Sequence, residues 1–189
     1  MSPLLSAATP TSQVLEEKSF WNAYREFTGA PEMDTHSYGD ISRYADRPLP
    51  DGPLSNAIDL LSECPSRSDD ANGSLWSLGW VGGDVVDSIK RTETAYVHRH
   101  MLTLLRPTPV WPNAAAPGVG EDLLAWTDAM IDIIAPYTPA ESYQNFPNRR
   151  ILDWPTQYYA ENLDRLIDVK SRHDSDNMFR HAQSIPIRT

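Results

Sequence analysis

The sequence is poor in cysteine, in basic residues and in long apolar runs. Cys64 is the only cysteine among 189 residues, which excludes an internal disulfide and any metal site built from several cysteines. The 16 basic residues are outnumbered by 26 acidic ones, and the formal net charge of -10 repels phosphate backbones and anionic lipids. No apolar run approaches the roughly 20 residues needed to cross a bilayer. Neither nucleic acid nor a membrane is therefore an expected partner.

Motifs that bind nucleotides or metals are also missing. The sequence has no G-x-G-x-x-G or G-x-x-x-x-G-K-[ST] loop and no H-E-x-x-H pair. Gly79, Gly82 and Gly83 precede Asp84 in a pattern that turn chemistry explains better than nucleotide binding. Residues 1–14 lack the basic start and apolar centre of a secretory signal, so we expect a cytoplasmic protein.

The sequence does contain a mixture of helical and extended patterns. We expect residues 1–12 to form a flexible N-terminus and residues 13–189 to form a single domain. Apolar residues at helical spacing predict helices over 13–27, 54–64, 121–135 and 155–172. Strands are predicted over 41–44, 75–81 and 96–105, and the proline-rich segment 107–120 is predicted to be a loop outside any sheet. These patterns predict an α+β fold with helices packed on one face of an antiparallel sheet.

Aromatic and imidazole side chains gather on two of the predicted strands. Trp76 and Trp80 would share one face of the first strand, and Tyr96, His98 and His100 would share one face of the second. They could line a substrate pocket or pack as ordinary core residues. His98 and His100 could also share a ligand, but the sequence shows no third ligand, so no metal site is predicted.

The last quarter of the chain carries a series of motifs in order. They read YQNF at 143–146, YYAEN at 158–162, VK at 169–170, DSDNMF at 174–179 and QSI at 183–185. This order resembles the C-terminal end of berberine-bridge-type FAD-linked oxidases. A sparser likeness continues upstream through TAYVHR at 94–99 and ISRY at 41–44. The resemblance covers roughly 15–187 and implies the fold of that family's substrate domain, with a C-terminal tail at about 140–187.

The resemblance also implies an activity and a cofactor. It implies FAD-linked oxidation or oxidative cyclisation of a small secondary-metabolite-type molecule. Tyr143 and Asn145 would then face the cofactor, and the expected substrate-binding residues are Trp76, Trp80, Tyr96, His98, His100 and Phe146. The family's FAD-binding domain has no counterpart in this sequence. We therefore expect FAD to come from a separate FAD-binding subunit, with a homodimer as the other possible assembly.

Several positions depart from the family's pattern, including a milder change at Ser175. Phe146 stands where the family commonly has a tyrosine that serves as catalytic base, and a phenyl ring has no proton to exchange. Leu104, Leu105 and Arg106 stand where the family often supplies a glutamate or glutamine. Ala160 replaces a glycine, in a segment where we predict a helix that tolerates alanine. The catalytic residues therefore remain unassigned.

These departures leave two further functions open. The first is a cofactor-free cyclase or isomerase, for example a cycloaddition catalyst, that reuses the substrate pocket of this fold in natural-product biosynthesis, because folding a substrate into a reactive conformation needs shape more than acid or base. The second is an inactive gene remnant.

Overall fold

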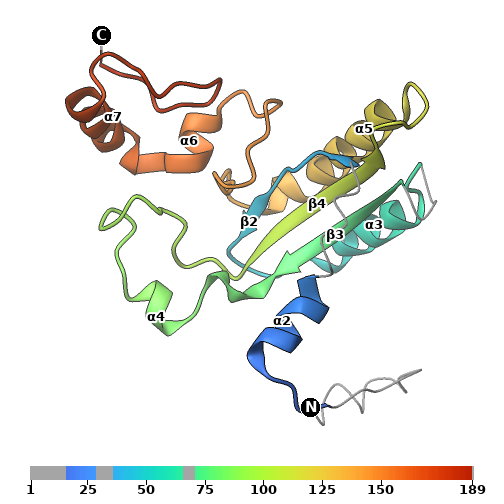
Figure 1. Cartoon of the computed structure of the whole chain (residues 1–189). Helices are drawn as coiled ribbons and strands as arrows, with labels where there is room; N and C mark the ends of the chain where they lie inside the picture. Colours follow the sequence, from blue (N-terminus) through green and yellow to red (C-terminus); the bar gives the residue numbers. More distant parts are fainter. Residues whose placement is uncertain (1–15, 29–35, 66–70, 189) are drawn as a thin grey trace. The chain divides into compact units, whose positions relative to one another are not determined.

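The structure is a computed structural model that describes residues 16–28, 36–65 and 71–188 (Figure 1). The predicted flexible N-terminus at 1–12 lies outside the described residues. Contacts divide the chain into two units, residues 1–35 and 36–189. The first unit contains α2 (Phe20–Thr28), which begins later than the predicted helix over 13–27. All other described elements belong to the second unit.

The second unit is built around one long central strand. The four strands are β1 (His36–Tyr38), β2 (Arg43–Ala45), β3 (Asn72–Leu78) and β4 (Thr103–Pro112). Each of the first three pairs with β4 in antiparallel register. Because β3 covers β4 residues that also pair with β1 or β2, β3 must lie along the opposite edge of β4 from those two strands. The sheet is therefore wholly antiparallel, as predicted.

The predicted boundary between strand and loop near Leu105 is wrong. Residues 96–102 form no strand, whereas β4 continues through Pro107 and Pro109. The Pro109 carbonyl accepts from the Gly39 N–H at 3.3 Å, so its backbone faces the edge occupied by β1 and β2. Pro107 faces the same edge because alternate residues of a strand do so. Residues 39–42 form no strand there, so both prolines lie where the ladder needs no N–H donor.

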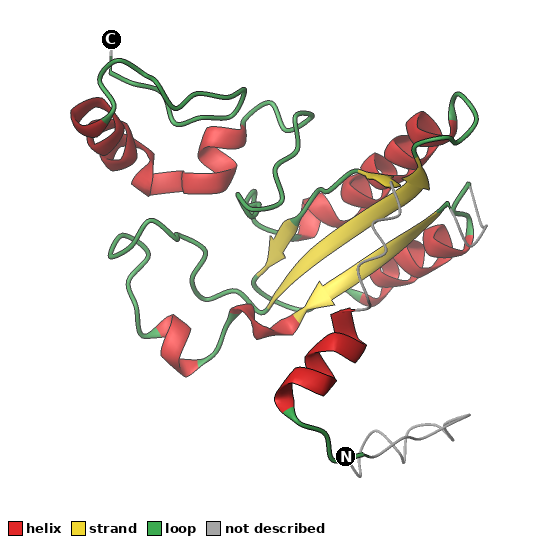
Figure 2. Ribbon diagram, in the orientation of Figure 1, coloured by secondary structure: helices red, strands yellow, loops and turns green. Residues whose placement is uncertain are grey.

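Two helices cover one face of this sheet (Figure 2). They are α3 (Asp51–Ser62) and α5 (Val119–Ile134), close to the helices predicted over 54–64 and 121–135. Leu123, Trp126 and Met130 form the buried stripe of α5, as their helical spacing predicts. Ile134 packs with Leu105 of β4, which fixes this as the face that the helices cover. The predicted α+β class, with helices on one face of an antiparallel sheet, is confirmed.

Short elements and the C-terminal tail complete the second unit. After β3 come η1 (Gly79–Val81) and α4 (Asp84–Asp87), and after α5 come η2 (Ala135–Tyr137), α6 (Trp154–Tyr159), η3 (Ala160–Asn162) and α7 (Leu163–His173). Tyr158 anchors the tail by packing with Ile41 and Ile151 in a buried cluster. None of the helices in the described ranges is long and apolar enough to span a membrane.

The helix predicted over 155–172 is interrupted at Ala160. This residue has φ 39° and ψ −124°, which ends α6 and turns the chain into η3. Positive φ strains an L-residue with a Cβ, whereas glycine adopts it freely. The prediction that alanine is tolerated here as a helix residue was therefore wrong, because Ala160 has a positive φ and not the backbone conformation of a continuous α-helix.

Candidate functional site

The face of the sheet opposite α3 and α5 carries a small aromatic cavity of about 310 Å³. Its floor comes from the sheet, since Leu104 pairs with Tyr44 on one side and with Leu78 on the other. Its walls come from the loops that precede β4 and follow α5, and from the segment around α4. The lining residues are Tyr44, Leu78, Val81, Val86, Tyr96, Arg99, Leu104, Tyr143 and Phe146. We call this space the aromatic cavity.

Ring contacts hold the walls of the aromatic cavity together. The Tyr44 and Tyr96 hydroxyls lie 3.0 Å apart, and the ring of Tyr143 lies 6.1 Å from that of Tyr96. Tyr143 and Phe146 meet edge to face at 5.4 Å between centroids. The Tyr143 hydroxyl also accepts a hydrogen bond from Asn145 Nδ2 at 2.9 Å. Rings fixed in this way form a shaped apolar wall with a few hydroxyl groups.

A layer of paired charges lies behind these rings. His98 stacks on Tyr44 with 4.3 Å between ring centroids, and its Nδ1 lies 2.7 Å from Glu141 Oε2. Arg91 NH2 donates to Glu141 Oε1 at 2.8 Å. Arg91 also donates from Nε to Glu161 Oε1 at 2.6 Å. This cluster fixes the loop before β4 to the segment that leads into the tail.

Burial and hydrogen bonds set the ionisation of these groups. Burial, helped by the hydrogen bond with Tyr96, raises the pKa of Tyr44 far above its usual value. Burial also raises the pKa of Tyr96. Burial alone would raise the pKa of Glu141, but the hydrogen bonds from His98 and Arg91 outweigh it and hold that pKa below its usual range. The two phenols are therefore neutral, and the carboxylate is ionised at neutral pH.

The structure brings together only some of the residues expected to bind substrate. Tyr96 and Phe146 line the aromatic cavity, and His98 is fully buried directly behind it. Trp76 shares the sheet face with Leu78, as predicted, but is 54% exposed and does not line the cavity. The Trp80 side chain lies outside the described part of the structure.

His100 is separated from His98. It has φ 61°, its side chain is 63% exposed, and its backbone N–H donates to Asp87 Oδ1 at 2.9 Å. The expectation that the two imidazoles share a face is wrong, because residues 96–102 are irregular rather than extended in a strand.

Six of the nine lining residues were not named as site residues from the sequence: Tyr44, Leu78, Val81, Val86, Arg99 and Leu104. Tyr44 and Arg99 end the ISRY and TAYVHR motifs, so the resemblance carried a signal for both. Leu104 belongs to the stretch noted for lacking a carboxylate.

Arg106, in the same stretch, pairs with the carboxylate of Asp40. Its guanidinium donates from Nε to Asp40 Oδ1 at 2.9 Å and from NH2 to Oδ2 at 2.8 Å. The same guanidinium lies 4.1 Å over the Phe146 ring. A bidentate pair of this kind fixes the arginine plane, and the cation–π contact then fixes the ring. Arg106 therefore positions Phe146 at the rim of the cavity.

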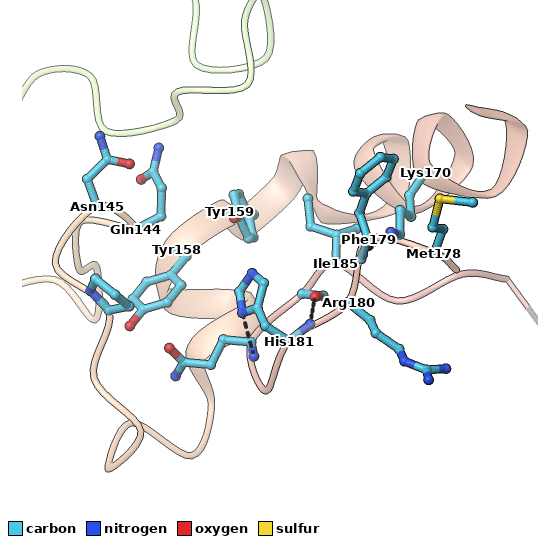
Figure 3. A pocket seen from close by; sticks show the side chains of 13 residues that line it. Gln144, Asn145, Tyr158, Tyr159, Lys170, Met178, Phe179, Arg180, His181 and Ile185 are labelled. Carbon is cyan, nitrogen blue, oxygen red and sulfur yellow. Dashed lines mark hydrogen bonds between the residues drawn. The ribbon is translucent and has the colours of Figure 1, made fainter. Parts of the chain in front are cut away.

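A second, wider pocket lies within the tail, between its first loop at residues 144–147 and its last segment at residues 178–185 (Figure 3). Its volume is about 680 Å³, and its lining includes Lys170, Arg180 and the imidazole of His181. Gln144 and Asn145 lie at one end of it, and Met178 and Phe179 lie at the other (Figure 3). Met178 and Phe179 are 75% and 76% exposed, which is high for such apolar side chains. We call the part of the tail formed by Met178 and Phe179 the tail surface.

The comparisons with known proteins agree with this architecture. Residues 142–186 match the family model described as "Berberine and berberine like". The chain is 28% identical over 188 residues to "Uncharacterized FAD-linked oxidoreductase YgaK" of Bacillus subtilis (strain 168), across 98% of this chain and 39% of that protein. It is 25% identical over 193 residues to "Monolignol oxidoreductase AtBBE-like 13" of Arabidopsis thaliana, across 95% of this chain and 32% of that protein.

A solved structure shows the same fold. Berberine bridge enzyme from Eschscholzia californica superposes with a TM-score of 0.72 at 21% identity, over 83% of this chain and 34% of that chain. The fold is thus that of the substrate domain of FAD-linked oxidoreductases. The chain is homologous to the berberine bridge enzyme-like FAD-linked oxidoreductases, which confirms the resemblance read from its motifs. It spans about two fifths of the length of the two Bacillus relatives that it matches, 39% and 40%.

The described residues do not form an FAD site by themselves. The Tyr143 hydroxyl is already engaged by Asn145, and the nearby Gln144 Oε1 is a buried acceptor with no partner among the described residues. A dinucleotide also needs backbone N–H groups that cradle its pyrophosphate, usually from a glycine-rich loop, which this sequence lacks.

Proposed function

We propose that this chain is the substrate-binding part of a berberine-bridge-like FAD-linked oxidoreductase. Its substrate would be a small secondary-metabolite-type molecule, which is oxidised or oxidatively cyclised. The flavin would be held by an FAD-binding unit outside these 189 residues, which we take to be a separate subunit. The observation that carries the proposal is the aromatic cavity on the open sheet face of a chain homologous to FAD-linked oxidoreductases.

In this proposal the chain binds and orients, and the flavin supplies the oxidising power. The rings of Tyr96, Tyr143 and Phe146 form flat walls suited to a planar molecule. Tyr44 and Tyr96 stay protonated because their pKa values are raised, so they can donate hydrogen bonds but cannot act as bases at neutral pH. Phe146 cannot exchange a proton either. These three lining residues therefore supply no base for the oxidation.

The tail surface is the part of the chain suited to meet the FAD-binding unit. Phe179 and Met178, which both line this pocket, expose 76% and 75% of their area. Apolar side chains grouped in this way favour a protein partner over water. Asn145 and the unpartnered Gln144 lie at the other end of the same pocket and offer polar contacts to that partner.

A pair of variants tests this proposal. Tagged wild-type chain, Phe179→Asp and Leu152→Asp would be purified from the cells that produce the protein naturally, and the FAD released on denaturation would be measured. Leu152 is the matched control because it is 91% exposed but does not line the tail pocket. We expect FAD with wild type and Leu152→Asp and a large loss with Phe179→Asp. A colourless homodimer or monomer in all three preparations would refute the proposal.

A cofactor-free cyclase or isomerase is the second candidate function. It is favoured by the apolar lining of the aromatic cavity, which can shape a substrate, and by Phe146, which cannot exchange a proton. Turnover of a linear precursor by the purified chain in the absence of flavin would support this function. Complete dependence of turnover on an added flavoprotein would exclude it.

A further inference from the structure

Among the described residues, Arg99 is the only arginine, lysine or carboxylate that lines the aromatic cavity. It is 8% exposed, and its guanidinium carbon lies 4.8 Å from the Tyr96 ring centroid. NH2 donates to Thr94 Oγ1 at 2.9 Å. Nε is buried and has no hydrogen-bond partner among the described residues. A permanently charged side chain thus lies at a cavity with part of its donor capacity unused.

Two partly buried arginines of this unit show a pairing that Arg99 lacks. Arg91 is paired with Glu141 and Glu161, and Arg106 is paired with Asp40. Within the described residues, no carboxylate forms an ion pair with Arg99. A charge removed from water without a partner of opposite sign is strongly disfavoured. An anion in the cavity would remove this cost.

We propose that the aromatic cavity binds a planar aromatic molecule that carries an ionised carboxylate, with Arg99 as the charge partner of that carboxylate. This rests on the proposed function only in using the same cavity, and it names the substrate class of that site. The planar guanidinium fork matches a carboxylate better than it matches a single oxygen. The flat faces of Tyr96, Tyr143 and Phe146 match an aromatic ring. A volume of about 310 Å³ limits the ligand to about two fused rings.

The test compares two probes of nearly the same shape, one anionic and one neutral. Binding of naphthalene-2-carboxylate and of naphthalene-2-carboxamide to the purified chain would be measured by titration calorimetry. We expect the carboxylate to bind at least about tenfold more tightly, as a charge-assisted hydrogen bond provides. We also expect added salt to weaken binding of the carboxylate probe and to leave binding of the amide probe unchanged. Equal affinities for the two probes would overturn the proposal.

Variants then assign the preference to Arg99. Arg99→Gln should bring the two probes to the same affinity, and Arg99→Lys should keep part of the preference as a point charge. Arg47→Gln is the matched control, because the Arg47 side chain is 72% exposed and lies outside the cavity lining. If Arg99→Gln melts early, Arg99→Lys and the wild-type preference decide the outcome. A preference that survives in folded Arg99→Gln would overturn the assignment.

This test does not depend on the flavin. If the probes bind equally while FAD copurifies with the chain, the substrate class is wrong and the proposed function stands. If the carboxylate is preferred while no FAD is ever found, the substrate class stands and the proposed function fails. A carboxylate side chain of the FAD-binding unit is the competing partner for Arg99. It would appear as a preference that is present in the chain alone and lost in the FAD-loaded complex, and that outcome would overturn the proposal.

Discussion

Successive residues of β4 point to opposite faces of the sheet, and the two faces differ in chemistry. On the face covered by α3 and α5, Leu105 packs with Ala45 and Ile134 in a wholly apolar cluster. On the open face, Leu104 is followed two residues later by Arg106, which is paired with Asp40. One face therefore stabilises the fold through close packing, and the other is free to carry the groups that recognise a ligand.

The open face also shows how charge can be kept beside an aromatic wall. Glu141, Arg91 and His98 form a bonded cluster under the rings, and Arg106 is fixed by Asp40. Unlike Arg91 and Arg106, Arg99 forms no ion pair with a carboxylate of the described residues. The comparison teaches that the open face is organised around one unpaired charge rather than being generally polar.

The largest loss of stability is expected when packing on the helix-covered face is disrupted. Met130→Ala removes a side chain with no exposed area and leaves a cavity in the α5 core, so we expect a loss of about 2–5 kcal/mol in the free energy of unfolding. Urea denaturation would measure it. Met178→Ala is the matched control, because Met178 is 75% exposed and should lose less than about 0.5 kcal/mol. Equal losses in the two variants would show that α5 does not form the core.

The next largest loss of stability is expected when the charged layer under the open face is disrupted. Glu141→Gln removes a carboxylate that accepts from Arg91 and pairs with His98, and we expect a loss of about 1–3 kcal/mol at pH 7. Because the pKa of Glu141 is lowered in the folded state, its contribution is fully present above the ordinary glutamate pKa and is lost as the pH falls below it. The difference between the two proteins should therefore shrink in urea titrations carried out at decreasing pH. A difference that grows toward acid would contradict this assignment.

A smaller effect, of opposite sign, is expected on stability at a position outside the sheet. Ala160→Gly should stabilise the chain by about 0.5–1 kcal/mol, because glycine adopts φ 39° without strain and the gain is partly offset by its greater freedom in the unfolded chain. Thermal melting would measure the shift. Ala125→Gly, at an exposed position within α5, should instead destabilise by up to about 1 kcal/mol. Destabilisation by both changes would show that Ala160 is not strained.

The smallest predicted effect sharpens the limits of the aromatic cavity. Trp76→Ala changes a half-exposed side chain on the open face beyond the cavity, so we expect a stability change of less than about 0.5 kcal/mol and unchanged binding of naphthalene-2-carboxylate. Calorimetry of the variant would check the binding. A large loss of affinity would extend the ligand site along β3 and restore Trp76 as a substrate-binding residue.

Local patterns in the sequence were sufficient for the regular core. The spacing of Leu123, Trp126 and Met130 predicted α5, and the alternation around Trp76 and Leu78 predicted β3. The limits of β4 could not be predicted, because Pro107 and Pro109 normally exclude a central strand. They are tolerated only because β1 and β2 leave a gap opposite them, and that gap is a tertiary feature.

The candidate site was predicted less well than the fold. Tyr96 and Phe146 line the cavity as expected, but His100 does not, because a loop with a positive φ replaced the predicted strand. Arg99 acquires its importance from the absence of a neighbouring carboxylate. That absence depends on how segments distant in the sequence pack together, so no pattern in the sequence could reveal it.

The most direct test of the central claim, that the open face is the ligand face, is an amide NMR titration with the two naphthalene probes. The account predicts that shifted signals cluster at Leu104, Arg99 and Phe146, while Met130 and Leu105 remain unchanged. Shifts that cluster instead at residues of the helix-covered face, or only at the tail pocket around Gln144 and Ile185, would contradict it.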